Sequence, residues 1–267
     1  MPVKWTQIEK LKNFRELNRL YVLENRTIGE ISTILGVGQS TVYDRLLRLG
    51  ITPTPNKKDK FLNIKKLSIP NFSDDLAEVI GILLGDGNVS ESQVRITFGA
   101  TEIKYLKYVQ KLFKEVFGIK PKMFRRKSNH LDLYAGSVVL IRFLMDMGFV
   151  RNKKLGQVGV PSWILKGSSS GYKERFIRGF FDTDGSIYQL QHGGWQISFC
   201  NSSTNLLKDT RNMLIELGYS PSKISGMNLY LTRKNDLIKF ECKVGPRQDH
   251  KAGRLRGCCG AVKRSRL

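Results

Sequence analysis

Two aspartates, each followed directly by a glycine, are the residues of this sequence best suited to chemistry. Asp86 closes the apolar run 79–85, and Asp184 closes a second run, 177–183. If both runs are helices, each carboxylate stands at a helix C-terminus, where the helix dipole opposes an anion by roughly 0.3–1 kcal/mol. A second carboxylate nearby adds repulsion, which a divalent cation held by carboxylate oxygens would relieve. Such ions activate water for phosphodiester cleavage, so the pattern predicts a hydrolytic metal site.

Asp-Gly is also a common hairpin turn, and a lone copy would favour that interpretation. Both runs, however, carry small residues four positions apart, Gly81 and Gly85 in the first and Gly179 and Thr183 in the second. Small residues on one helical face let two helix backbones approach closely. A glycine inside a helix costs about 0.5–1 kcal/mol relative to alanine, so its use in both copies favours two tightly packed helices.

The segments that follow the two aspartates repeat in the same order, which predicts two similar halves. Each half continues with a strand that alternates apolar and polar residues, an amphipathic helix ended by glycine, two further strands and a last helix. The expected strands and middle helices are 94–98, 103–117, 122–126 and 131–134 in the first half, and 195–199, 205–217, a strand centred on Lys223 and 229–232 in the second. With a strand directly after each Asp-Gly, each half therefore reads αββαββα.

The second motif, FIRGFFDTDGSI at 176–187, resembles the signature of the LAGLIDADG homing endonucleases. The first motif is looser, with Leu84 where that family often has an acid, but it keeps Gly81, Asp86 and Gly87. The resemblance extends over about residues 73 to 255. It implies an α+β, pseudo-twofold αββαββα repeat in which two four-stranded antiparallel sheets form a saddle over duplex DNA.

The same resemblance implies the chemistry of the site. Asp86 and Asp184 would hold Mg²⁺, which Mn²⁺ would replace, and would cut both DNA strands with short 3′ overhangs. Gly85 and Thr183, the residues before the aspartates, belong to the same metal site and to the helix interface with Gly81 and Gly179. Asp182 matches a family position that supports helix packing, so it is left out of the catalytic set.

Basic residues also recur across the repeat. Lys153 and Lys154 follow Gly148, and Lys251 occupies the place equivalent to Lys154 in the second half. Lysines beside a scissile phosphate stabilise its developing charge, which makes Lys154 and Lys251 the catalytic candidates. The alternative is a solvated lysine in a lysine-rich chain.

The polar faces of the strands predict a surface that reads DNA, because Arg and Gln recognise base edges and Lys positions phosphates. A polar outer face is also the default for a sheet exposed to water. The candidate contacts on the strands are Gln93, Arg95, Thr97, Lys122, Arg126, Tyr134, Tyr188, Gln196, Ser198, Lys223, Asn228, Tyr230 and Thr232.

Residues 1–51 predict a small all-α module ahead of the repeat. Segment 27–46 resembles a helix-turn-helix in which Ile28, Ile31, Ile34 and Leu35 form one buried face and residues 36–38 the turn. The exposed start of its second helix would present Gln39, Ser40, Thr41, Tyr43 and Arg45 to DNA. A helical hairpin for protein contacts is the alternative.

We expect a basic linker at 52–72, LAGLIDADG halves at 73–166 and 167–255, and a flexible basic tail at 256–267.

Net charge supports a polyanionic partner. The 267 residues carry 45 Lys and Arg against 23 Asp and Glu, a formal charge of +22. The longest apolar stretch, 76–85, is about half the length of a membrane span, and no signal peptide opens the chain. The four cysteines lack a zinc or disulfide pattern, which predicts an intracellular protein in cytoplasm, nucleoid or organelle matrix.

These features together predict a monomeric, site-specific, Mg²⁺-dependent double-strand DNA endonuclease with an added helix-turn-helix. Two alternatives stay open: a transcription regulator that binds DNA without cleaving it, and a maturase that binds intron RNA. The chain begins at Met1 and ends at Leu267 without a terminal Asn or an initial nucleophile. We therefore expect a free-standing nuclease rather than a splicing element.

Overall fold

The computed structural model describes residues 13, 16–24, 26–49, 51, 69–91, 93–126, 128–150, 158–167 and 170–264. The chain divides into two compact units, Met1–Asn63 and Ile64–Leu267. Each unit has its own hydrophobic core. No helix among the described residues is both long enough and apolar enough to cross a membrane.

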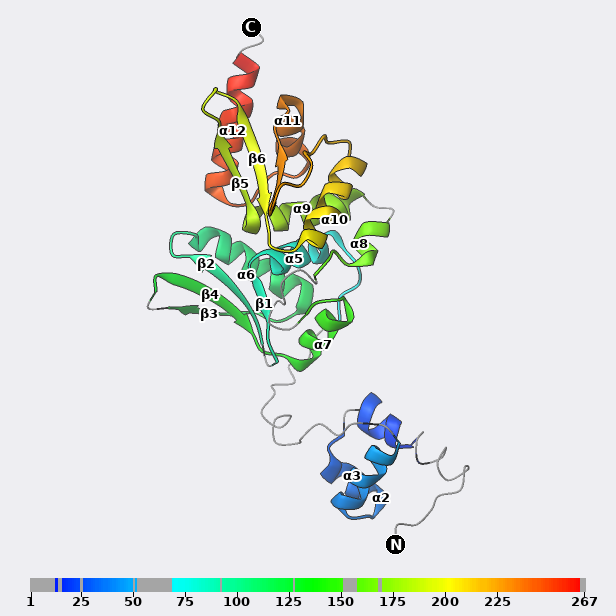
Figure 1. Cartoon of the computed structure of the whole chain (residues 1–267). Helices are drawn as coiled ribbons and strands as arrows, with labels where there is room; N and C mark the ends of the chain where they lie inside the picture. The colour runs from blue at the N-terminus through cyan, green and yellow to red at the C-terminus, as the bar shows by residue number, and fades with distance from the viewer. Residues whose placement is uncertain are drawn as a thin grey trace. The chain divides into compact units, whose positions relative to one another are not determined.

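The smaller unit contains a short π-helix, η1 (Asn18–Leu23), followed by α2 (Ile28–Leu35) and α3 (Gln39–Arg48) (Figure 1). Thr27 caps α2 in a reciprocal capping box with Glu30, and Gly36 ends the helix with a φ of +62°. The prediction that Ile34 is buried is wrong, since its side chain is 52% exposed. At 100° per residue Ile34 points well away from the stripe that Ile28 and Ile31 bury.

The first half of the larger unit begins with α5 (Asp74–Gly85) and continues through β1 (Gly87–Val89), β2 (Val94–Gly99), α6 (Ile103–Phe117), β3 (Lys122–Arg125), β4 (His130–Ala135) and α7 (Val138–Asp146). Its four strands form an antiparallel sheet in the order β1-β2-β4-β3. Val94, Ile96 and Phe98 of β2 are buried, while the residues between them are partly exposed on the other face. The alternating sequence is thus the direct cause of a sheet with one face on the core.

Helix α8 (Ser162–Lys166) precedes the second half, which contains α9 (Ser170–Asp184), β5 (Gly185–Gln189), β6 (Trp195–Cys200), α10 (Thr204–Glu216), β7 (Asn228–Leu231), α11 (Lys234–Lys243) and α12 (Asp249–Arg264). Its sheet has three strands in the order β5-β6-β7. In Figure 1 the helices α5 and α9 lie between the two sheets. One continuous hydrophobic cluster extends through both halves.

The strand predicted around Lys223 is wrong, so the second sheet lacks its fourth strand. Pro221 has no N–H to give to a ladder. The Ser222 carbonyl accepts a hydrogen bond from Arg211 Nε at 2.9 Å, and the Ser222 hydroxyl, rather than the backbone, accepts the Tyr230 N–H at 3.1 Å. Backbone pairing with β7 is reduced to isolated contacts: the Ser222 N–H donates to the Tyr230 carbonyl at 2.9 Å, and Ser225 and Asn228 form a single bridge.

The flexible tail predicted from residue 256 onward is also wrong up to Arg264. Helix α12 continues through this segment, and Leu255 and Cys258 on one side of it are buried. The sequence of this segment contains many basic residues, so its short apolar side was not recognised as a helix face that packs on the core. Residues 265–267, like linker residues 52–68, lie outside the described part of the chain.

Candidate active site

The two motif helices touch along their backbones. A Cβ atom added at Gly81 would overlap the Phe176 carbonyl oxygen of α9, and one added at Gly179 would overlap the Glu78 carbonyl oxygen of α5. The structure thus brings the predicted interface residues together in a seam with no room for side chains. Such a seam fixes the axial position of one helix against the other within a fraction of an ångström.

The seam ends at Gly85 and Thr183. A Cβ at Gly85 would coincide with the Thr183 side chain, whose hydroxyl donates to the Phe180 carbonyl at 3.0 Å and lies 3.1 Å from that of Gly179. Since Asp86 follows Gly85 and Asp184 follows Thr183, both aspartates stand at the same end of the helix pair. The arrangement that the sequence predicts for these two acids is the one the helices adopt.

The two aspartates have different surroundings. Asp86 is exposed and forms the C-cap of α5, its N–H donating to the Ile82 carbonyl at 3.1 Å. Asp184 is half-buried and accepts a 2.5 Å hydrogen bond from Asn201 Nδ2. The Ser203 N–H in turn donates to Asn201 Oδ1 at 2.7 Å, which fixes the amide group. Asn201 was missed by sequence analysis, although an Asn two residues before the Ser203 helix cap was a visible signal.

Lys251 of α12 lies against the C-terminal end of α9. Its side chain is buried, and the ammonium donates to the Asp182 carbonyl at 2.6 Å and the Phe181 carbonyl at 2.9 Å. Burial lowers the pKa of Lys251, against the opposing effect of Asp182, Asp86, Glu102 and Asp184. Lys251 therefore places a positive charge where the helix dipole is negative, within electrostatic reach of both motif aspartates. Lys154, its predicted counterpart, lies outside the described residues.

A pocket opens beside this lysine. It is lined by Asp86, Glu102, Thr183, Gly185, Ser186, Ile187, Gln248, His250, Lys251 and Arg254. Gln248 Nε2 donates to Glu102 at 3.0 Å, while Gln248 Oε1 is buried without a hydrogen-bond partner in the described part of the chain. The second half thus contributes most of the groups that surround the aspartate of the first half.

This donor set fits a Mg²⁺ ion that is shared with a substrate. The described residues contain no group of three or more His, Cys, Asp or Glu side chains that would bind a metal by themselves. Mg²⁺ usually takes one or two protein carboxylates and completes its shell with water and substrate phosphates. Gln248 Oε1 is an available acceptor for a metal-bound water. The Thr183 carbonyl, also predicted at the metal site, lies 3.5 Å from the Lys251 ammonium.

Asp182 is fully buried two residues before the end of α9. Its carboxylate accepts the Arg247 N–H at 3.0 Å and the Gln248 N–H at 3.3 Å. Burial raises the pKa of Asp182 to about 7, although these hydrogen bonds and Lys251 act in the opposite direction. Asp182 thus attaches α9 to the segment that carries Gln248 and Lys251 into the pocket.

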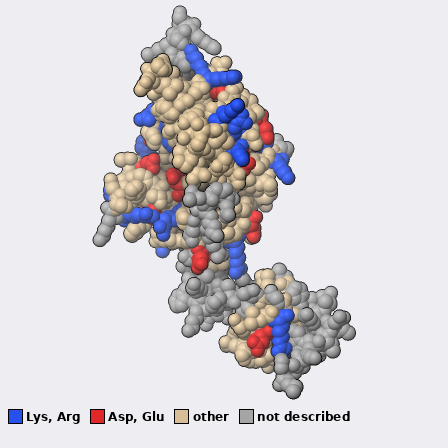
Figure 2. Space-filling model, in the orientation of Figure 1, with Lys and Arg blue, Asp and Glu red and all other residues tan. Residues whose placement is uncertain are grey.

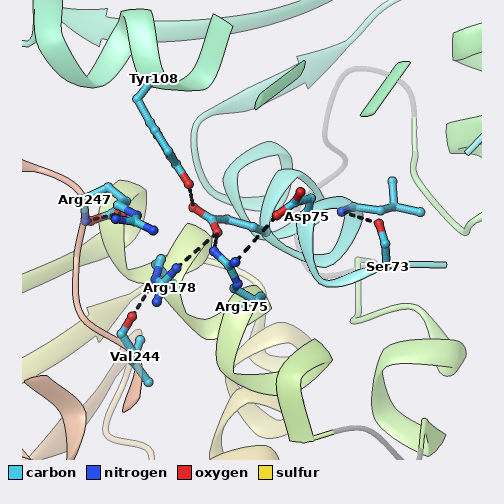
Figure 3. A network of polar contacts seen from close by, with 10 residues as sticks. Ser73, Asp75, Tyr108, Arg175, Arg178, Val244 and Arg247 are labelled. Atoms are coloured by element: carbon cyan, nitrogen blue, oxygen red, sulfur yellow. Dashed lines mark hydrogen bonds and ion pairs between the residues drawn. The ribbon is translucent and has the colours of Figure 1, made fainter. Parts of the chain in front are cut away.

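A second buried carboxylate, Glu78 of α5, joins the two halves. Figure 3 labels its partners Tyr108, Arg175 and Arg178. Glu78 accepts hydrogen bonds from Tyr108 of α6 at 2.5 Å and from Arg175 of α9 at 2.8 Å. Arg178 lies 3.5 Å from the same carboxylate and donates through Nε to the Val244 carbonyl. This network is heterologous: the acid comes from the first half and both arginines from the second.

The strand residues predicted to contact DNA lie mostly on the outer faces. Arg95, Tyr134 and Lys122 form a row across β2, β4 and β3. The predicted DNA contact at Ser198 needs correction, because this side chain is only 6% exposed and its hydroxyl is hydrogen-bonded to that of Ser186 at 2.7 Å. Exposed members of the predicted set are Lys122, Tyr188, Lys223 and Thr232; half-buried members are Gln93, Arg95, Thr97, Arg126, Tyr134, Gln196, Asn228 and Tyr230.

In the smaller unit, Gln39, Ser40, Thr41 and Tyr43 are exposed on α3, and Arg45 is half-buried. On the face that Figure 2 shows, Lys and Arg side chains lie over both halves of the larger unit with Asp and Glu side chains between them. On this face the basic side chains are thus not confined to one element.

The family model described as a LAGLIDADG-like domain matches this chain twice, at residues 73–148 and 171–245. The chain belongs to the LAGLIDADG family. The first match begins just before α5 and the second at the second residue of α9, and each covers the motif helix and the sheet of one half, which confirms the resemblance drawn from the motifs.

Two curated relatives of this LAGLIDADG protein cover most of it. The replication factor C small subunit of Methanocaldococcus jannaschii is 28% identical over 93% of this chain and 14% of its own length. The probable translation initiation factor IF-2 of Thermococcus kodakarensis is 27% identical over 84% of this chain and 19% of its own length. The chain thus spans less than a fifth of either relative.

Solved structures share the fold. The LAGLIDADG meganuclease I-AabMI, crystallised with uncleaved DNA, is 11% identical with a TM-score of 0.50, covering 73% of this chain and 92% of the meganuclease. I-DmoI, in complex with DNA and Ca, is 17% identical with a TM-score of 0.49, covering 69% and 97%. At 11% identity the likeness to I-AabMI shows the fold alone, which is the predicted α+β arrangement of helices on two antiparallel sheets.

Proposed function

We propose that this LAGLIDADG protein is a site-specific DNA endonuclease that uses Mg²⁺, with Mn²⁺ as a substitute. The observation that carries the proposal is the placement of Asp86 and Asp184 at one end of a seam where Gly85 meets Thr183. Two anions at two helix C-termini are unfavourable without a cation. Several solved LAGLIDADG proteins are bound to DNA, which supports DNA as the substrate class.

Each residue then has a definite task. Asp86 and Asp184 would hold the metal, which when bound lowers the pKa of a water and stabilises charge on the scissile phosphate. Gln248, in the same pocket as Asp86, would orient a water through its free Oε1. Lys251 keeps the end of α9 in place and offsets the combined negative charge of the aspartates while no substrate is bound.

The outer faces of the sheets would bind duplex DNA, and the helix-turn-helix unit would add contacts beyond them. Tethering the two units raises the effective concentration of the second for a neighbouring DNA segment. Both halves of the larger unit come from a single chain and share a core, so one molecule would present both aspartates to the two strands. We therefore propose a monomer, acting inside the cell where genomic DNA lies.

The relatives support a portable module. A replication factor and an initiation factor are named for different processes, yet a segment of each resembles most of this chain. The similarity therefore concerns the shared segment rather than either named activity. A nuclease that belongs to a mobile genetic element would occur in such unrelated settings.

The test is cleavage of the uninterrupted form of the locus that carries this reading frame. We expect wild type to cut both strands in Mg²⁺ and not in EDTA. Asp86→Asn and Asp184→Asn should each lower cleavage by at least about 10²-fold, because a ligand of the metal loses its charge, while binding in EDTA stays within a few-fold of wild type.

The outcome separates the alternatives. Wild-type binding without cleavage of the locus in Mg²⁺ or Mn²⁺ would leave a transcription regulator. Preferential binding of the intron transcript, with splicing rescued, would leave a maturase. Asp236→Asn on α11, a helix whose contacts lie in the second half, serves as the charge-matched control and should cleave normally.

A further inference from the structure

A buried carboxylate lies on the outer face of the first sheet, where the proposed DNA surface would be expected to avoid negative charge. Asp132 of β4 is 4% exposed, whereas its neighbours Leu131 and Leu133 point to the core. It is the one acidic residue among the described strand residues of the two sheets. A carboxylate in that place would repel DNA phosphates unless its charge were neutralised.

Both oxygens of this carboxylate are engaged. Thr97 of β2, directly opposite in the register, donates its hydroxyl to Oδ1 at 2.9 Å. Arg126, just beyond β3, donates Nε–H to Oδ2 at 2.6 Å. Because both oxygens are engaged and the side chain is only 4% exposed, Asp132 is poorly accessible to a cytosine amino group, which is the contact an exposed Asp makes in the major groove. The role of Asp132 is instead to hold the side chain of Arg126 in place.

The ion pair fixes the guanidinium of Arg126 and leaves its outer edge available. Only Nε is used by Asp132, and the structure gives the two Nη atoms no hydrogen bond within the described residues. A guanidinium has five N–H donors in one plane, and with Nε–H on Asp132 the paired Nη–H donors form a second edge that points away from this carboxylate. The Arg126 side chain is 38% exposed, which places that edge at the surface.

A hollow surrounds this edge. It is lined by Gln93, Arg95, Phe124, Arg126, Asp132 and Tyr134, which lie on the same face of three adjacent strands. A planar donor pair held in a hollow of aromatic, amide and guanidinium groups is suited to the edge of a base. An arginine that only grips phosphate needs no fixed plane, and an adjacent carboxylate would weaken that grip.

We propose that Arg126, positioned by Asp132 and Thr97, recognises a guanine in the major groove and sets the preference at one position of the target. The Nη donors match the O6 and N7 acceptors of guanine, the commonest specific arginine contact. Asp132 is a positioning residue in this assignment, because it acts through Arg126. The inference rests on the proposed DNA binding but not on cleavage.

The experiment is a binding selection with the full chain on duplex DNA randomised across the target, in EDTA so that binding alone is measured. We expect wild type to prefer G at one position by roughly 5- to 150-fold, and Arg126→Ala to lose that preference. Asp132→Asn keeps the shape and removes the charge; it should weaken the preference at that position and leave the others unchanged. Arg125→Ala, exposed on the opposite face of β3, is the matched control and should keep the wild-type profile.

The results that overturn the assignment are distinct. If Arg126→Ala weakens binding to all sequences equally and lowers the salt slope by about one, Arg126 contacts a phosphate. If Asp132→Asn leaves the guanine preference intact, its positioning role is refuted even where Arg126 reads the base. A wild-type protein that selects no sequence refutes this inference and the site-specific function together, whereas selection without Mg²⁺-dependent cleavage refutes only the nuclease.

Discussion

At the scale of single residues, three aspartates near the end of the motif helices carry out different tasks because their environments differ. Asp86 is exposed, Asp184 is held by Asn201, and Asp182 is buried against two backbone N–H groups. Sequence alone distinguished Asp86 and Asp184 through their repeated Asp-Gly pattern. It could not reveal the task of Asp182, because its partners, the N–H groups of Arg247 and Gln248, come from a segment far along the chain.

The buried Asp182 gives a pH dependence of stability with a definite sign. Burial raises its folded-state pKa to about 7, above the ordinary Asp value of 3.8, so the folded protein keeps this proton in a range where the unfolded chain has lost it. The contribution to the free energy of unfolding is therefore greatest below about pH 4 and declines as the pH rises towards 7. Asp182→Asn, which has no proton to lose, should remove this decline.

The measurement is urea unfolding of both proteins in EDTA at intervals from pH 4.5 to 7.5. Subtracting the two curves cancels the other titrating groups, and the stability of wild type relative to the variant should fall with pH. A difference that stays level or rises would show that Asp182 is already ionised throughout this range.

At the scale of elements, the seam between α5 and α9 determines where both aspartates stand. Gly179→Ala would place a methyl group on the Glu78 backbone carbonyl, which cannot move aside as a flexible side chain would. We expect a loss of about 1–3 kcal/mol of stability, or more, from overpacking. Cleavage should fall further than the loss of folded protein explains, since separating the helices separates the two carboxylates.

Gly253→Ala on α12 is the matched control. Its position is exposed in a helix with open space around it, so the same substitution should stabilise by about 0.5–1 kcal/mol. Thermal unfolding of the two variants beside wild type decides the matter. Equal melting temperatures for Gly179→Ala and wild type would mean that the helices are not in backbone contact.

Helices were more predictable from the sequence than the second sheet. The pattern gave α6 its observed bounds, because an amphipathic stripe and a terminal Gly118 are both local signals. The missing strand near Lys223 depended on Pro221 and on Arg211, whose side chain reaches a carbonyl from another element. Glu78 was visible as an acid within an apolar run, but its arginine partners lie in the other half and required the fold.

At the scale of the whole molecule, the two units have separate cores and should behave as separate folding units. A protein of residues 64–267 contains the entire larger core. We expect it to unfold at the temperature of the larger unit in the full chain and to retain Mg²⁺-dependent cleavage. Its affinity for DNA should be lower, because the contacts and charge of the smaller unit are lost.

Calorimetry and binding titrations at several salt concentrations would measure these effects. A truncated protein with the same DNA affinity and cleavage rate as the full chain would show that the helix-turn-helix unit serves another partner. A truncated protein that fails to fold would contradict the separation of the cores.

The two-half architecture was predictable because repetition is a property of the whole sequence and tolerates local errors. The ion pairs between Glu78 and the two arginines of the second half were not predictable, because Glu78 has no acidic counterpart in the repeat. Its equivalent position is Phe176. The two similar halves therefore differ at their contact, where the first provides an acid and the second provides two arginines.

That difference limits how the halves can be recombined. A chimera joining the first half to a foreign second half without Arg175 and Arg178 would bury the Glu78 carboxylate with only Tyr108 as a partner. Stranding a buried charge in this way typically costs about 3–5 kcal/mol. Successful grafts should therefore carry both arginines with them, or replace Glu78 by an apolar residue such as the one its pseudo-symmetric counterpart already uses.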